Sequence, residues 1–192
     1  MEFKTGKVHK TFATKSGKTC IIRWAKWDDL QQLTDFINEI AQEDTYISFS
    51  PEDDVTLEFE SKFLSSVLSD GSLRRASYIV AEIEGNIVGA SGVSLETKSR
   101  ARSRHVASFG ISILEQYRGE GIGDSLIEIA IIHAQDFLED IKLITLTAFA
   151  ENKPAIGLYE KHGFKQVGKI PNALFRKNSY SDEIIMIKEL PA

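Results

Sequence analysis

Cysteine, proline and long apolar runs are scarce in this chain of 192 residues, which contains one cysteine, Cys20, and four prolines. A single cysteine forms no disulfide within the chain and supplies no set of thiolate ligands, so disulfide-rich scaffolds and cysteine zinc sites are excluded. No stretch of about 18 apolar residues occurs, as a membrane-spanning helix needs, and the first residues lack the apolar core of a signal peptide. We therefore expect a cytoplasmic protein without a membrane partner.

Positive charge is also in short supply. The chain has 23 Lys and Arg against 28 Asp and Glu, a formal net charge of −5, and its pI is near 5.5. Proteins that bind nucleic acid usually present a basic surface, so we expect no nucleic-acid partner. An anionic ligand would have to be bound by main-chain dipoles and a few cations.

The rest of the composition is typical of one globular domain. Apolar residues make up 42% of the chain and charged residues 27%, unlike disordered or fibrous chains. The length fits a single domain that buries a substantial core, and no repeat or linker divides it.

Apolar spacing predicts the order of the secondary structure. Glu84-Gly85 between two strand-like segments is a strong hairpin signal. The predicted strands of the sheet lie at 19–24, 77–83, 86–95, 103–114, 143–148, 164–168 and 183–188, with an added strand before them at 8–14. The predicted helices follow Asp28 or Asp29 and lie at 53–69, 119–137 and 152–162. This order predicts an α+β fold in which a mixed, mostly antiparallel sheet of about six to seven strands is flanked by about four helices.

The most informative segment runs from Ile113 to Asp124, where a strand ends, three glycines alternate with other residues and a helix begins. Such a turn leaves unpaired N–H groups at a helix N-terminus, where the helix dipole also favours negative charge, so it can bind a phosphate or diphosphate. The spacing is neither the Gly-x-Gly-x-x-Gly of dinucleotide folds nor a P-loop.

Two motifs resemble the GNAT superfamily of N-acetyltransferases. Arg-Gly-Glu-Gly-Ile-Gly at 118–123 matches the diphosphate motif of that family, and Asn-Lys-Pro-Ala at 152–155 followed by 158–164 matches its second cofactor motif. The segment 22–25 with the two aspartates after it is similar to the family's first strand and helix. The resemblance covers the chain from about residue 20 and implies an N-acetyltransferase domain at 19–192, preceded by an extension at 1–18 that adds a strand.

The four histidines are scattered and have no companion cysteine or acid at ligand spacing, so we expect no metal site. The resemblance also implies a cofactor site for acetyl-coenzyme A (acetyl-CoA). Main-chain groups of Ile111 and Ile113 would pair with the pantetheine arm, and an N–H near Ile113 or Leu114 would polarise the thioester carbonyl. Asn152 and Tyr159 would line the arm, and Tyr159 would protonate the departing thiolate. The diphosphate would be bound by the backbone of Arg118, Gly119, Gly121, Ile122, Gly123 and Asp124.

A general base is harder to assign. Glu82 and Glu96 near the ends of strands and His105 early in a strand are candidates, because neighbouring strands can direct side chains into one cleft. For each of them a solvent-facing or structural role is the simpler explanation, and Glu82 is the one we favour as a base. His133 shares a helix face with apolar residues, which indicates a core histidine, and His162 fits a helix-capping role.

The predicted activity is transfer of an acetyl group from acetyl-CoA to a primary amine by direct attack in a ternary complex. The acceptor is a small molecule, an amino acid, or a peptide or protein amine; the tail at 175–183 resembles that of acetyltransferases acting on small molecules and amino acids. Two alternatives stay open, an acyl-CoA sensor of the same fold without turnover and a nucleotide-binding regulatory domain. The resemblance also allows a homodimer formed through the late strands.

Overall fold

One mixed sheet forms the centre of the protein. The computed structural model describes residues 1–47, 49–95 and 102–191. The strands are β1 (Val8–Ala13), β2 (Thr19–Trp24), β3 (Ala76–Ile83), β4 (Asn86–Leu95), β5 (Val106–Ile113), β6 (Leu143–Phe149), β7 (Lys165–Arg176) and β8 (Ser179–Glu189). Their order across the sheet is β1-β2-β3-β4-β5-β6-β8-β7, and every pair except β5 with β6 is antiparallel. The predicted α+β fold is confirmed, with slightly more strands than the six to seven expected.

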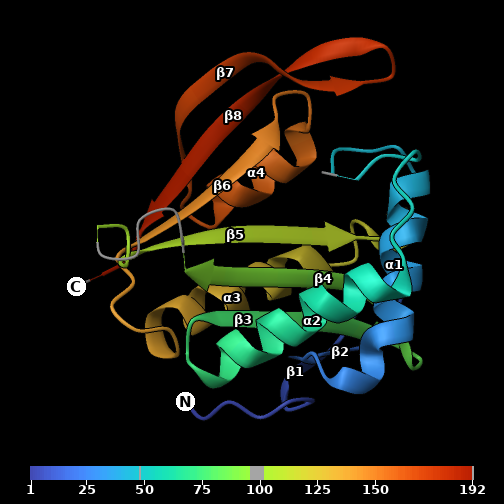
Figure 1. Cartoon of the computed structure of the whole chain (residues 1–192), viewed down its shortest axis with the longest axis vertical. Coiled ribbons are helices and arrows are strands. Elements are labelled where there is room, and N and C mark those ends of the chain that lie inside the picture. The colour runs from blue at the N-terminus through green and yellow to red at the C-terminus, as the bar shows by residue number, and fades with distance from the viewer. Residues whose placement is uncertain (48, 96–101, 192) are drawn as a thin grey trace.

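Four helices cover the two faces of the sheet (Figure 1). They are α1 (Leu30–Gln42), α2 (Leu57–Ser72), α3 (Ile122–Asp136) and α4 (Lys153–Lys161). The second helix begins later than the sequence predicts because Thr56 is its N-cap, with a side chain that accepts a hydrogen bond from the Phe59 N–H at 3.2 Å.

Apolar residues form one cluster on each face of the sheet. Trp24, Leu126 and Phe137 belong to the cluster under α3, and Leu33 and Leu64 belong to the cluster under α1 and α2. All five side chains are fully buried. Burial on both faces fixes which way each strand residue points, and therefore which side chains reach the clefts described below.

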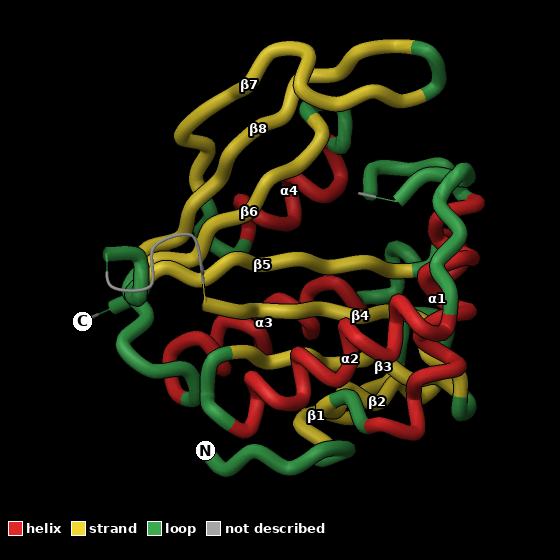
Figure 2. The backbone as a smooth tube through the Cα atoms, viewed as in Figure 1, coloured by secondary structure: helices red, strands yellow, loops and turns green. Residues whose placement is uncertain are grey.

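The sheet parts between β5 and β6. The two strands pair only where Val106, Ala107 and Ser108 face Leu143, Ile144 and Thr145. Beyond Ser108 they diverge, and Figure 2 shows the gap that widens toward the end of β5. The loop between α1 and α2 lies near the wide end of this gap (Figure 1).

β7 and β8 form a hairpin much longer than the strands predicted at 164–168 and 183–188. Its turn is made by Lys177 and Asn178, both with positive φ angles of 49° and 57°. The register shifts between Ile170 and Leu174, around Pro171. A bulge with a proline interrupts the alternation on which sequence-based strand prediction depends, which explains the underestimate.

Candidate active site

The glycine loop leads directly into α3. Gly119 and Gly121 have φ angles of 78° and 86°, which residues with a Cβ adopt only under strain, and Gly121 is the N-cap of α3. No side chain caps this helix, so the first N–H groups, from Ile122 to Asp124, are left for a ligand or solvent.

Gly123 is needed for a different reason. A Cβ on Gly123 would lie 2.9 Å from Leu158 Cδ2 and 3.4 Å from Ile113 Cδ1. The missing side chain therefore lets the first turn of α3 approach α4 and the end of β5.

A cleft of about 560 Å³ lies between the glycine loop, the end of β5 and α4, and we call it the loop cleft. Its lining includes Gly119, Gly121, Gly123, Asp124, Asn152 and Tyr159. Lys15, in the turn between β1 and β2, also lines it, and the Ser16 N–H of that turn donates to Glu120 Oε2 at 2.8 Å. The sequence marks this segment only as a turn, so Lys15 was missed.

The Arg118 side chain is engaged within the protein. Its guanidinium forms an ion pair with Glu43, and its Nε donates to the Ile113 carbonyl oxygen at 2.9 Å. Glu43 Oε1 also accepts the Glu115 N–H at 2.7 Å. The end of α1 thus fixes the chain that leads into the glycine loop.

Asp124 contacts two side chains at the C-terminal end of α4. Lys161 Nζ lies 2.6 Å and His162 Nε2 3.0 Å from Asp124 Oδ1. The hydrogen bond from Lys161, with a second from His162, lowers the pKa of the Asp124 carboxyl. A carboxylate beside the loop cleft is therefore paired with the Lys161 ammonium. His162 is also the C-cap of α4, at the helix end where the sequence predicts a capping role.

The main chain of β5 has free groups facing the gap. The Leu114 N–H donates to the Val88 carbonyl oxygen at 3.1 Å, so it is used within the sheet. Hydrogen-bonding direction alternates along an antiparallel strand, and the groups of Ile111 and Ile113 therefore face β6 across the gap. Two N–H groups, those of Ile113 and Leu114, are candidates for polarising the thioester carbonyl. That of Ile113 faces the gap, whereas that of Leu114 is bonded within the sheet. The Leu114 side chain is buried with the α1 and α2 cluster.

Tyr159 lies on α4 with 8% of its surface exposed. Its ring packs edge-on against Phe109 and Phe164, at centroid distances of 6.3 Å and 6.1 Å. Burial raises the pKa of the hydroxyl to about 12, so it stays protonated at neutral pH. Asn152, the N-cap of α4, accepts the Ala155 N–H at 3.3 Å.

A second cleft, of about 430 Å³, adjoins the loop cleft, and we call it the strand cleft. Both clefts are lined by Tyr46, Ile111, Ser112, Asn152 and Tyr159, so Tyr159 stands at their junction. The strand cleft continues over β6, β8 and β7 under the loop that follows α1.

Three charged residues line the strand cleft, Asp44, Arg176 and Glu183. Arg176 Nε donates to the Asp44 carbonyl oxygen at 2.8 Å, and the Asp44 carboxylate lies 3.7 Å from Arg176 Nε and 3.8 Å from Lys177 Nζ. The Arg176 guanidinium also stacks on the Tyr46 ring at 4.5 Å. Glu183 has no ion pair among the described residues and is half-buried. Sequence reasoning placed Glu183 in a tail without assigning it a role.

Comparison with known proteins decides the family. The acetyltransferase (GNAT) family model matches residues 34–164, more than half of the chain. The chain belongs to the GNAT acetyltransferase family. The L-amino acid N-acetyltransferase AaaT of Escherichia coli (strain K12) is 32% identical over 110 residues, covering 57% of this chain and 66% of that protein, just under two thirds of its length. An N-alpha-acetyltransferase of Sulfurisphaera tokodaii is 30% identical over 161 residues, covering 80% of this chain and 84% of that protein.

A solved structure gives the same answer for the fold of this GNAT protein. The structure of yncA from Salmonella typhimurium with its cofactor acetyl-CoA has a TM-score of 0.78, covering 90% of this chain and 94% of that one. At 17% identity this likeness concerns the fold alone.

The two candidate bases within the described residues, Glu82 and His105, line neither cleft. Glu82 Oε2 lies 2.9 Å from the guanidinium of Arg23, whose two terminal nitrogens bond the buried carboxylate of Asp29 at 2.7 Å and 2.9 Å. Asp29 also accepts the Lys26 N–H, so it fixes the turn before α1, and Glu82 belongs to this structural cluster and lines neither cleft. His105 is exposed on a turn before β5, and Glu96 lies outside the described residues.

His133 is a core residue, as expected. Its Nδ1 lies 2.6 Å from Ser77 Oγ, which accepts the Trp24 indole N–H at 2.9 Å. Burial, with charge from His9 and Lys7, lowers the pKa of His133 to about 3. Within the described ranges, no group of three or more His, Cys, Asp or Glu side chains is placed to hold a metal ion, and no helix is long and apolar enough to span a membrane.

Proposed function

We propose that this protein transfers the acetyl group of acetyl-CoA to a primary amine of a small molecule, an amino acid or a peptide. The observation that carries the proposal is the position of Tyr159, buried where the loop cleft meets the strand cleft beside the parted end of β5. The structure of the same fold from Salmonella typhimurium contains acetyl-CoA, and two relatives are named for L-amino acid and N-alpha acetylation.

The loop cleft would hold the cofactor. The N–H groups at the start of α3 would bind its diphosphate, and Lys15 adds a cation from the opposite wall. The pantetheine arm would lie in the gap and pair with the main chain of Ile111 and Ile113 as a strand pairs with a sheet edge. This arrangement brings the thioester to Tyr159.

The chemistry then needs two polar groups at the junction. The amine nitrogen attacks the thioester carbon, and the Ile113 N–H stabilises the negative charge that develops on the carbonyl oxygen. When the C–S bond breaks, the protonated Tyr159 hydroxyl donates a hydrogen bond to the departing sulfur. An acceptor that arrives as an ammonium first loses one proton to a carboxylate or to water. The second proton, lost by the nitrogen as the amide forms, balances the proton gained by the thiolate, so the products are an amide, free coenzyme A and one released proton.

We assign recognition of the acceptor ammonium to Glu183, not to Glu82. Glu183 lines the strand cleft, whereas Glu82 is paired with Arg23 outside it. The other carboxylate of the cleft, on Asp44, is shared by Arg176 and Lys177. An amine with a pKa near 10.4 arrives protonated at neutral pH, and an unpaired carboxylate both attracts it and accepts its proton directly or through water.

The test is release of free thiol from acetyl-CoA with a panel of primary amines. Tyr159→Phe should lower kcat about tenfold or more while the acetyl-CoA dissociation constant stays within about twofold. Tyr180→Phe is the matched control, because Tyr180 is 68% exposed and lines neither cleft. Unchanged turnover of Tyr159→Phe would remove the tyrosine from the mechanism. Cofactor binding without thiol release from any amine would leave only the acyl-CoA-binding alternative.

A further inference from the structure

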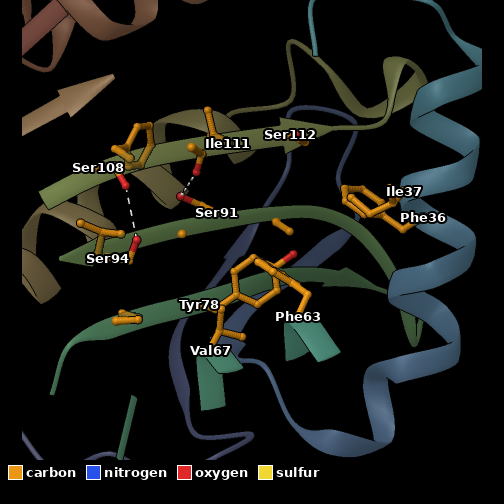
Figure 3. A pocket seen from close by; sticks show the side chains of 17 residues that line it. Phe36, Ile37, Phe63, Val67, Tyr78, Ser91, Ser94, Ser108, Ile111 and Ser112 are labelled. Carbon is orange, nitrogen blue, oxygen red and sulfur yellow. Dashed lines mark hydrogen bonds between the residues drawn. The ribbon is translucent and has the colours of Figure 1, made fainter. Parts of the chain in front are cut away.

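A third hollow, of about 360 Å³, opens between the sheet and the helices α1 and α2, and we call it the side pocket. Figure 3 shows Phe36 and Ile37 of α1 and Phe63 and Val67 of α2 around the strands β3, β4 and β5. The Tyr78 ring of β3 packs edge-on against Phe63 at 5.2 Å. The walls of the side pocket are therefore mainly aliphatic and aromatic.

Small residues make the floor of the side pocket. Gly92 of β4 and Gly110 of β5 lie directly opposite each other, so two neighbouring positions on this face have no side chain. A Cβ built on Gly110 meets no atom within 4 Å, which shows that the space above it is open. Three of the hydroxyls nearby are bonded within the protein, Ser94 to Ser108 at 3.3 Å and Ser91 to the Gly110 carbonyl at 3.0 Å (Figure 3).

The side pocket joins the strand cleft along β5. Residues 109–112 line both hollows, and Ile111 and Ser112 also line the loop cleft. A molecule that extends from the side pocket into the strand cleft would therefore reach the cleft that Tyr159 lines.

We propose that the side pocket receives an apolar substituent of the acceptor amine and that Gly110 sets how large this substituent can be. The inference rests on the proposed function and names the substrate class: primary amines with a branched aliphatic or aromatic group, of the leucine or phenylalanine kind. None of the described residues lining the side pocket is charged, so a second ammonium group there would lose its hydration without gaining a partner.

The experiment compares a large and a small amine in the full-length protein. We expect kcat/KM for 3-methylbutylamine and 2-phenylethylamine to exceed that for ethylamine about tenfold or more. Among amino acids, we expect kcat/KM for L-leucine and L-phenylalanine to exceed that for glycine by a similar factor. In Gly110→Val the ratio of kcat/KM for the large amines to kcat/KM for the small amines should fall about tenfold, while the acetyl-CoA dissociation constant stays within about twofold. The acetyl-CoA dissociation constant is the internal control for folding and for cofactor binding.

A second variant works in the opposite direction. Val67→Ala enlarges the side pocket from the α2 side and should shift the preference toward 2-phenylethylamine over 3-methylbutylamine. Preference of the wild-type protein for glycine or for 1,4-diaminobutane would overturn the inference, and so would an unchanged ratio in Gly110→Val. Acetyl-CoA binding without turnover of either panel also overturns it, whereas failure to bind acetyl-CoA overturns the proposed function itself.

Discussion

Glu43 and Arg118, 75 positions apart in the chain, form an ion pair that ties the end of α1 to the entrance of the glycine loop. The same carboxylate accepts the Glu115 N–H. One side chain therefore fixes both the backbone and the guanidinium of a segment that leads to the proposed diphosphate site. It also connects this segment to the loop that covers the strand cleft, since Asp44 follows directly.

Removal of the negative charge of Glu43 should make the glycine loop less well fixed. We expect Glu43→Gln to raise the coenzyme A dissociation constant about three- to tenfold, which corresponds to about 1 kcal/mol for a partly exposed, charge-assisted contact. Isothermal titration calorimetry with coenzyme A measures the effect. Glu39→Gln is the matched control on the same helix, because Glu39 only contacts the Gln116 side chain at 3.4 Å. Equal effects of the two substitutions would show that the pair does not position the loop.

Gly121 and Gly85 offer a matched test of the glycine loop. Both have positive φ angles, 86° and 82°, and a Cβ at either position meets no atom within 4 Å. Alanine should therefore cost each site about 1 kcal/mol of folding stability through backbone strain alone. Only Gly121→Ala should also weaken coenzyme A binding, on the order of tenfold, because Gly121 is the N-cap of α3, where we propose that the diphosphate binds. Comparable affinity of the two variants for coenzyme A would contradict the loop's role.

The acceptor side can be tested through Glu183. We expect Glu183→Gln to lower kcat/KM for amines about tenfold or more, through a higher KM and a lower kcat, because the ammonium loses its carboxylate partner and its proton acceptor. Steady-state kinetics at pH 8 with saturating acetyl-CoA give both constants. Glu189→Gln, an exposed position on the same strand, is the control. If Glu82→Gln lowered activity while Glu183→Gln did not, the base would have to be sought near Arg23 instead.

His133 should make the fold sensitive to acid. Burial lowers its pKa from 6.5 to about 3, so at intermediate pH the unfolded chain binds a proton that the native protein does not. Stability is therefore lost as pH falls from about 6.5 toward 3, by about 2 kcal/mol at pH 5. Urea unfolding at pH 7 and pH 5 should show a smaller loss in His133→Gln than in wild type, whereas the exposed His105→Gln should behave as wild type does.

Glu60 should have the opposite dependence on pH. Its side chain is 2% exposed, its Oε1 has no partner within the described part of the chain, and burial raises its pKa from 4.5 to about 7. The native protein thus keeps a proton that the unfolded chain releases, and stability falls as pH rises from about 4.5 to 7, by up to about 3 kcal/mol. Glu60→Gln should remove this fall, so its advantage over wild type should grow between pH 5 and pH 8 in thermal unfolding. If the difference in stability between Glu60→Gln and wild type stayed constant from pH 5 to pH 8, the ionised carboxylate would have to lie in a stabilising contact that offsets its burial.

Sequence patterns predicted the elements with strong local signals. The hairpin at Glu84-Gly85, the glycine loop and the helix capped by Asn152 all depend on residues within a few positions of one another, so periodicity and turn chemistry reveal them. The family resemblance added the expectations for the strand that contains Ile111 and Ile113 and for Tyr159. The long β7–β8 hairpin was underestimated because Pro171 and a register shift break its alternation.

Side-chain pairing over long distances could not be read from the sequence. Glu82 was chosen for its place near a strand end, but its orientation toward Arg23 depends on the register between β2 and β3. Glu183 faces the strand cleft because β8 lies between β6 and β7, an order that no local pattern specifies.

The parting of β5 and β6 also has a mechanical consequence. Among the described residues, the two strands share three facing pairs, so the sheet consists of two panels, β1 to β5 and β6 with the final hairpin, joined by a short seam. A molecule bound in the open part of the gap between β5 and β6 would hydrogen-bond to β5 and fill the space between the panels. We therefore expect ligand binding to restrict the movement of one panel relative to the other.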